Sequence, residues 1–301
     1  MKLSLNSFLL IPLATLFTFA SLPAIADAHH EKPSSFVATK ITDNITMLQG
    51  KGGNIAVLNG AQGTLVIDDD YQDMSPALNK ALSPFGGTDA LRYIINTHWH
   101  GDHTGGNLSL GHSAAIVAHD NVRQRLLTKQ EIKLFNMVSQ PYPKNALPSI
   151  TYQKRLSLHF NDEEIQLIHL ANGHTDGDSV VLFKDANVIH MGDHFFNGFF
   201  PFIDLGTGGN AVTMAANVES IIKIIDEDTV VIPGHGPLAN KQDLKAFHAM
   251  LIGTTKEVKE MKQTGMSLEK IQQKGLSDTW DSWTGGFLST DVWIQILDGS
   301  L

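Results

Sequence analysis

Four apolar stretches of this chain each end directly in side chains that commonly bind metal ions. The stretch 93–97 runs into "HWHGDH", and three later stretches run into a lone histidine or aspartate. Short runs of Val, Ile and Leu between turn residues predict buried β-strands. Strand ends at one edge of a layered fold converge in space, so we expect a common site there. Its candidate members are His98, His100, Asp102, His103, His174, Asp193 and His235.

Strand and helix patterns alternate along the chain, which indicates an α/β protein built in layers. Strands are expected within 54–60, 63–70, 91–97, 114–120, 164–172, 179–183, 187–193 and 229–236. Helical spacing of apolar residues predicts helices at 75–83, 119–138, 211–226 and 241–263. Nothing along the pattern marks an internal boundary, so a single domain is expected over 27–301.

Two further segments carry structural expectations. Three prolines make 139–149 a loop and a candidate lid over the site. Near the chain end, Trp280, Trp283 and Trp293 are expected to pack in the interior rather than to contact substrate.

Residues 1–26 have the three parts of a secretory signal peptide. Lys2 is the positive start, 8–20 is the apolar region, and Ala24-Ile25-Ala26 is a small-x-small cleavage site. The apolar region is short for a membrane span. The sequence therefore predicts export to a bacterial periplasm, cleavage after Ala26 with Ala28 as the alternative, and no stable membrane insertion afterwards.

Composition narrows the chemistry of the site. The net charge of −9 and the absence of any long basic run argue against a nucleic-acid partner. The chain has no cysteine, which excludes disulfides, thiolate nucleophiles, iron–sulfur clusters and cysteine-bound zinc. Any metal must be held by imidazole and carboxylate groups, and the expected partner is a small-molecule substrate. The oligomeric state stays open.

The order of these ligand residues resembles the signature of the metallo-β-lactamase superfamily, and the likeness covers nearly the whole chain after residue 26. The resemblance implies a four-layer αββα sandwich with a two-metal site at one edge of the paired sheets. It also implies that one metal is held by His98, His100 and His174. The second would be held by Asp102, His103 and His235, with Asp193 bridging the two.

The residue types agree with hydrolytic chemistry. Imidazole and carboxylate ligands suit zinc, so two zinc ions per chain are expected, with iron and manganese as alternatives. Two divalent ions together generate a bridging hydroxide at neutral pH and polarise the substrate oxygen. Asp102 and His235 are the candidate catalytic residues, with Asp102 placed to orient that hydroxide. The expected reaction is attack on the acyl carbon of a β-lactam, a lactone or another ester-like substrate.

Asp193 indicates which members of the superfamily the chain resembles most. Lactamases that use a cysteine at this position are excluded, and the aspartate resembles hydroxyacylglutathione hydrolases, lactonases and phosphodiesterases of the superfamily. The longer stretches around the ligands look most like exported, lactamase-like zinc hydrolases, some of them associated with quinoprotein ethanol oxidation. These stretches are "THWHGDHTGGN", "HTDGDSVV", "GDHFFNGFFPFIDLGTGGN" and "PGHGPL". The alternatives are an iron-dependent oxidoreductase of the same fold, such as a sulfur dioxygenase, a phosphodiesterase, and an inactive metal-binding scaffold.

Residues beside the motifs carry weaker expectations. His194 should point away from the site and pack, and His169 and His190 read as core histidines. Asp68 either supports the metal-binding turn or only ends a strand, and Asp176 and Asp178 pose the same question. Of the five phenylalanines at 195, 196, 199, 200 and 202, most should be core, and one or two should contact an apolar part of the substrate.

Overall fold

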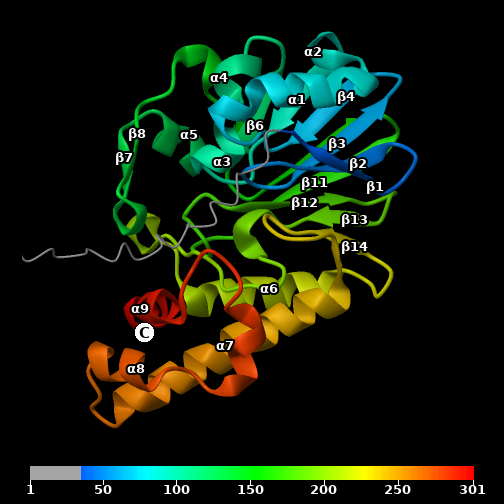
Figure 1. Cartoon of the computed structure of the whole chain (residues 1–301). Coiled ribbons are helices and arrows are strands. Elements are labelled where there is room, and N and C mark those ends of the chain that lie inside the picture. The colour runs from blue at the N-terminus through cyan, green and yellow to red at the C-terminus, as the bar shows by residue number, and fades with distance from the viewer. Residues whose placement is uncertain (1–34) are drawn as a thin grey trace, which may run out of the picture. The chain divides into compact units, whose positions relative to one another are not determined.

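Two β-sheets lie face to face at the centre of the molecule (Figure 1), as seen in a computed structural model that describes residues 35–301. Those residues belong to one compact unit. The expected signal peptide at 1–26 and its cleavage sites lie outside the described residues. Within 35–301, no helix is both long enough and apolar enough to cross a membrane.

The first sheet has seven strands in the order β1-β2-β3-β4-β5-β6-β9. They are β1 (Val37–Lys40), β2 (Ile45–Gln49), β3 (Ile55–Gly60), β4 (Gly63–Ile67), β5 (Leu91–Ile95), β6 (Ala115–His119) and β9 (Ile150–Tyr152). β1 to β4 pair antiparallel, whereas β4, β5, β6 and β9 run parallel. Parallel pairing puts the ends of β4 and β5 at the same edge, and the first ligand motif follows β5.

The second sheet has six strands in the order β10-β11-β12-β13-β14-β15. They are β10 (Arg155–Phe160), β11 (Glu163–His169), β12 (Ser179–Phe183), β13 (Val188–His190), β14 (Val230–Ile232) and β15 (Ala239–Asn240). β13 and β14 are parallel and the other pairs are antiparallel. The remaining candidate ligands follow β11, β13 and β14.

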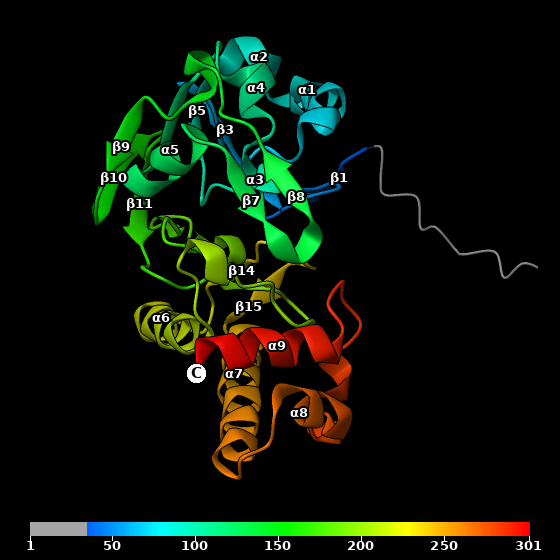
Figure 2. The ribbon, with the colours of Figure 1, turned by 90° about the vertical axis from the view of Figure 1, so that its left-hand side faces the viewer.

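Helices cover the outer face of each sheet (Figures 1 and 2). On the side of the first sheet lie α1 (Ser75–Leu82), α2 (Gly87–Ala90), α3 (Gly101–Thr104), α4 (Asn107–Leu110) and α5 (Asp120–Leu126). On the side of the second sheet lie α6 (Ala211–Ile224), α7 (Lys241–Gln263), α8 (Leu268–Lys274) and α9 (Thr290–Ser300). Short 3₁₀ turns join them: η1 (Gln72–Met74), η2 (Ser83–Phe85), η4 (Lys144–Ala146), η5 (Gly192–His194), η6 (Leu205–Thr207) and η7 (Asp278–Trp283).

Three buried clusters hold the layers together. Between the sheets, Leu58 and Ile95 of the first sheet pack in one cluster with Leu167 and Val181 of the second. A smaller cluster lies between the first sheet and α1. The largest joins the second sheet to α6, α7 and α9. These layers, helix–sheet–sheet–helix, confirm the expected αββα sandwich.

The helix expected over 119–138 is wrong in its second half. The helix ends at Leu126, and β7 (Gln130–Ile132), η3 (Lys133–Phe135) and β8 (Met137–Ser139) form a separate two-stranded hairpin. The side chain of Gln130 caps the helix end by donating to the Arg125 carbonyl, 3.1 Å away. Asn136 then adopts a left-handed turn at φ 51°. Apolar spacing alone did not distinguish this hairpin from a continuing helix.

The proline-rich segment 139–149 is not the part of the chain that reaches over the site. Its Tyr142 is fixed to the body by its amide, which donates to the Leu126 carbonyl at 2.8 Å, and by its hydroxyl, 3.1 Å from that of Thr104. Ala146 is fully buried. The preceding hairpin β7–β8 instead reaches toward the loop before α9 (Figure 2).

The C-terminal tryptophans pack as expected. Trp293 of α9 is fully buried and stacks on Phe200, with ring centroids 5.6 Å apart. Its indole N–H donates to the Thr254 hydroxyl at 3.2 Å. Trp280 and Trp283 pack, partly buried, on the same cluster.

Candidate metal centre

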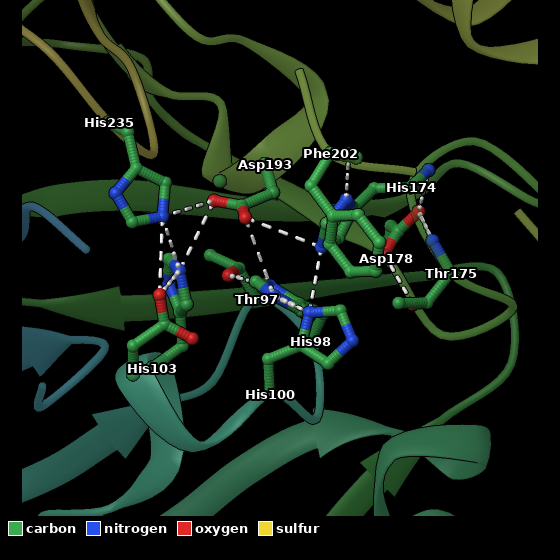
Figure 3. A network of polar contacts seen from close by, with 12 residues as sticks. Thr97, His98, His100, His103, His174, Thr175, Asp178, Asp193, Phe202 and His235 are labelled. Atoms are coloured by element: carbon green, nitrogen blue, oxygen red, sulfur yellow. Dashed lines mark hydrogen bonds and ion pairs between the residues drawn. The ribbon is translucent and has the colours of Figure 1, made fainter. Parts of the chain in front are cut away.

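All seven candidate ligands of the sequence come together at one edge of the paired sheets (Figure 3). Their ligand atoms form two groups, within each of which they lie no more than 4.8 Å apart. The first group is His98, His100, His174 and Asp193, and the second is Asp102, His103 and His235. Each group combines residues that follow β5 with residues that follow strands of the second sheet.

The turn after β5 explains how four ligands fit into six residues. His98 leaves the strand, His100 is the extended residue that starts α3, and Asp102 and His103 lie in the first turn of that helix. The short helix turns Asp102 and His103 toward the second group, whereas His98 and His100 face the first.

Glycines let the other segments approach this closely. A Cβ at Gly234, the residue before His235, would overlap the carboxylate of Asp193. A Cβ at Gly53, in the β2–β3 loop, would overlap the ring of His103. These two positions therefore accept no larger side chain without displacing a candidate ligand.

The imidazoles of the first group point nitrogen atoms at one another. The Nδ1 atom of His100 lies 3.1 Å from Nε2 of His98 and 2.8 Å from Nε2 of His174. The opposite nitrogens face acceptors: Nδ1–H of His174 donates to the Phe202 carbonyl at 2.7 Å. This outer bond fixes the tautomer and leaves a lone pair on the inner nitrogen.

Asp193 lies between the two groups. Its Oδ2 is 3.3 Å from Nε2 of His174, and its Oδ1 is 3.1 Å from Nε2 of His103 and 3.5 Å from Nε2 of His235. One carboxylate oxygen therefore faces each group, which is the arrangement that a bridging ligand requires.

The second group lies where the site opens to solvent. Asp102 Oδ2 is 3.3 Å from Nε2 of His235 and 3.6 Å from Nε2 of His103. The side chains of Asp102 and His235 are each 18% exposed, whereas the other five candidate ligands are almost fully buried. A substrate can therefore reach the centre from the side of Asp102 and His235.

Asp68 supports the ligands of the first sheet from behind. Its carboxylate accepts from Nδ1–H of His103 at 2.7 Å and from the amide and hydroxyl of Thr97, each at 2.8 Å. The Thr97 hydroxyl in turn lies 3.1 Å from Nδ1 of His98. Asp68 was expected either to support the metal-binding turn or only to end a strand. These hydrogen bonds show that it supports the turn.

Asp178 supports the loop that carries His174. Its carboxylate accepts the amides of His174 and Thr175, each at 2.7 Å, and the Thr175 hydroxyl at 2.5 Å. Burial raises the pKa of Asp178 well above its ordinary value. Asp176 behaves differently, because it forms an ion pair with Arg125 (2.7 Å) away from the ligands.

Sequence reasoning missed Asp204. This buried carboxylate places Oδ2 3.2 Å from Nε2 of His100 and so fixes the ring whose Nδ1 faces the first group. Asp204 follows His100 by 104 residues and belongs to none of the strand ends that pointed to the site. The η6 turn places it, and its Oδ1 accepts the Gly206 amide at 3.0 Å.

Burial keeps the deeper histidines neutral. Burial, together with the positive charge of His103, lowers the pKa of His98 well below its ordinary value. Burial likewise lowers the pKa of His174 to about 4, against the attraction of Asp193. A neutral imidazole is the form that binds a metal ion.

The second group instead attracts positive charge. Burial opposes charge on His235, but Asp193 and Asp102 outweigh it and raise the pKa of His235 to about 9. The pKa of His103 is raised well above its usual range by the same two carboxylates, also against burial. These two imidazoles therefore carry protons that balance the negative charge of the two carboxylates. A bound metal ion would take over that role.

The donor set fits divalent cations. The Oδ1 atom of Asp193, on the side of the second group, is buried and accepts no hydrogen bond, and the inner nitrogens of the first group point lone pairs at one another with no donor between them. Buried polar atoms normally have partners, and a cation in each group would supply one. Histidine and aspartate ligands are those of zinc and related ions.

The neighbouring histidines are packing residues, as expected. His194 is buried behind Asp193, with Nε2 3.1 Å from the side-chain amide of Asn217. His190 donates through Nε2–H to the Asn54 carbonyl at 2.9 Å. His169 stacks on His119 at the ends of β11 and β6, with centroids 3.6 Å apart.

The five phenylalanines divide between core and site. Phe195 and Phe200 are buried against α7 and α9. Phe196 stacks on His235 with centroids 5.2 Å apart, and Phe202 lies 5.7 Å from His100. Two of the five thus touch candidate ligands directly.

The segment that carries the site matches a known protein family. The model of the metallo-beta-lactamase superfamily matches residues 87–235, about half of the chain and the part that contains all seven candidate ligands. The fold on both sides of that segment is the sandwich of the same family. The chain belongs to the metallo-β-lactamase superfamily, and its centre is a cluster of histidine and aspartate residues suited to metal binding.

Similar proteins extend this result. The β-lactamase-like protein 2 homolog of Caenorhabditis elegans is 24% identical over 225 residues, which cover 67% of this chain and 64% of that protein. The probable metallo-hydrolase YqgX of Bacillus subtilis is 33% identical over 78 residues, covering 25% of this chain and 36% of that protein. The matches thus span less than two thirds of either relative.

Solved structures share the fold. The sec-alkylsulfatase Pisa1 from Pseudomonas sp. superposes with a TM-score of 0.67 at 12% identity, covering 87% of this chain and 49% of that one. A metallo-β-lactamase from Cronobacter sakazakii gives 0.62 at 16% identity, covering 76% and 97%. Similarity at these identities establishes the fold alone.

The Asp204–His100 contact gives a direct prediction. The variant Asp204→Asn should weaken metal binding at the first group about 10- to 100-fold, because His100 loses the carboxylate that orients its ring. Competition with a chromogenic chelator measures this, and Asp176→Asn, whose carboxylate pairs with Arg125 rather than with a candidate ligand, is the matched control. Equal affinity in both variants would show that Asp204 has no part in holding His100.

Proposed function

We propose that the protein is a zinc-dependent hydrolase that activates water at a dinuclear centre and attacks the acyl carbon of a β-lactam, a lactone or another ester-like substrate. The observation that carries the proposal is Asp193, whose two oxygens face two complete groups of ligand atoms. A centre for a single ion would not need the second group.

The residues divide the work as follows. Two divalent ions, when bound, supply a water of lowered pKa and polarise the substrate oxygen. Asp102 is ionised, because His103 and His235 hold its pKa below the ordinary value against burial, and so it can accept a hydrogen bond from that water. His235 stands beside it at the exposed edge. Hydrolysis adds the water oxygen to the acyl carbon, breaks the bond to the leaving oxygen or nitrogen, and transfers a proton to that atom.

We also propose that the protein is exported to the periplasm. A periplasmic location rests on residues 1–26 alone and would favour a β-lactam or another ester encountered outside the cytoplasm. Glutathione thioesters, which are mainly cytosolic, are then poor candidates.

The test is a substrate panel on protein of known metal content. We expect about two zinc ions per chain and slow hydrolysis of a chromogenic β-lactam or lactone. The panel also carries a phosphodiester, because of the alternative within the family, and an alkyl sulfate ester, because a structural relative is named for one. Hydrolysis of the phosphodiester or the sulfate alone would contradict the acyl assignment. Bound iron with oxygen consumption would replace hydrolysis by an oxidoreductase function.

A further inference from the structure

Phenyl rings from three separate segments meet beside the candidate metal centre. Phe135 comes from η3 at the tip of the hairpin, Phe202 from the loop before η6, and Phe287 from the loop before α9. Phe135 lies 4.8 Å from Phe202 and 6.3 Å from Phe287, measured between ring centroids. Phe287 in turn lies 6.4 Å from the ring of His235. The hairpin and the loop before α9 thus approach each other (Figure 2).

Two of these three rings are exposed although they are apolar. Phe287 is 54% exposed and Phe135 is 37% exposed. Leu134, Met137 and Val138 of the same hairpin are also exposed large hydrophobic residues. Single exposed apolar side chains are ordinary, but a group of them beside a site commonly marks a binding surface.

The hairpin is separate from the two large sheets. β7 and β8 pair only with each other, at three positions, and neither joins one of the large sheets. An isolated two-stranded hairpin is only marginally stable by itself. Its position therefore depends on what its apolar tip contacts.

A cavity of about 360 Å³ lies under the hairpin, and two of its lining residues, Phe202 and Asp204, contact the candidate ligand His100. Its apolar lining comes from the hairpin (Ile132, Leu134), from the loop at Phe202 and Leu205, and from Ile296 of α9. Small-molecule sites have volumes of roughly 300–1,000 Å³, so its size fits part of a ligand.

The inner end of this cavity is made by residues that contact a candidate ligand. Phe202 packs on His100, and Asp204 contacts its Nε2, so the carboxylate is already engaged. The charged residues of the hairpin that line the cavity are Glu131 and Lys133. The cavity therefore has a largely apolar lining, in which Phe202 is the ring nearest to His100.

We propose that the cavity under the hairpin binds an apolar chain attached to the acyl substrate, with Phe135, which packs on Phe202 of the cavity, and Phe287 beside it as specificity-determining residues. This inference rests on the proposed hydrolase function and narrows it to substrates with an extended alkyl or aryl group. Small polar acyl compounds would leave the exposed rings in water and gain nothing from them.

The test uses p-nitrophenyl esters of acetate, butyrate, hexanoate and octanoate with the zinc-loaded full chain. Burial of one methylene group corresponds to about a fourfold gain, so kcat/KM should rise by up to about fourfold per methylene. In the variant Phe135→Ala/Phe287→Ala, the octanoate-to-acetate ratio should fall at least about tenfold. Ile252→Ala, an equally exposed residue on α7, is the control and should keep the wild-type ratio.

Two further measurements make the outcome decisive. The variant Phe135→Leu/Phe287→Leu keeps apolar bulk and should retain most of the chain-length dependence, which distinguishes lost contact from lost folding. Calorimetric titration with 1-butanol and 1-hexanol measures chain binding without any turnover. Hexanol binding that depends on Phe135 and Phe287, in a zinc-loaded protein that hydrolyses no ester, lactone or β-lactam, would overturn the hydrolase function and leave the cavity assignment standing. Ester hydrolysis that does not depend on chain length, or a dependence that the double alanine variant leaves unchanged, would overturn the cavity assignment alone.

Discussion

Replacement of Asp102 by alanine is expected to lower kcat/KM by a factor of about 10²–10⁴, the range typical of a group that handles a proton in the reaction. Asp102 is the only carboxylate of the second group, and its Oδ2 lies 3.3 Å from Nε2 of His235. Its loss removes both a ligand and the acceptor that would orient the attacking water. Steady-state kinetics on protein of measured zinc content gives the effect.

The control for Asp102→Ala is Asp176→Ala. It removes a partly buried carboxylate that pairs with Arg125 and contacts no candidate ligand. If Asp102→Ala loses no more activity than Asp176→Ala while still holding two ions, Asp102 has no catalytic role.

Removal of the metal ions is expected to abolish activity and to destabilise the fold. An ion present at 100 times its dissociation constant stabilises the native state by about 2.7 kcal/mol, so two such ions contribute about 5 kcal/mol. For a domain of this size, each kcal/mol shifts Tm by about 2–4 °C, which gives a fall of roughly 10–20 °C. Differential scanning calorimetry before and after chelation measures the shift, and stoichiometric zinc should restore both Tm and activity.

A chelator presaturated with zinc separates metal loss from any direct effect of the reagent. Full turnover by protein whose metal content has been measured as zero would exclude the proposed mechanism, whatever the change in Tm.

The local part of the fold and site could be predicted from sequence. β-Branched runs identified eight of the strands, because burial on both faces leaves a continuous apolar pattern such as that of β12. The position of His98, Asp193 and His235 directly after such runs then indicated a shared edge. The edge strand β1, which is mostly exposed, and the edge strand β10, whose residues alternate between partial burial and exposure, carry a weaker signal and are among those missed.

The features that could not be predicted from the sequence depend on contacts between residues far apart in the chain. The partner of His100 is Asp204, and the ring above His235 is Phe287, neither of which belongs to the motifs. Residues 130–139 show apolar spacing that a helix could share, and only the Asn136 turn and the neighbouring loop at Phe287 select a hairpin. Propensity is a weak guide where tertiary packing decides.

The origin of the ligands has a consequence for how the molecule is assembled. In each group, some ligands follow β5 of the first sheet and the others follow strands of the second. Each ion would therefore bind ligands from both sheets and link the sheets at this edge. Neither half of the chain holds a full set of ligands by itself. Metal would be taken up only after both halves have folded and docked, and any movement that parts the sheets at this edge would release both ions together.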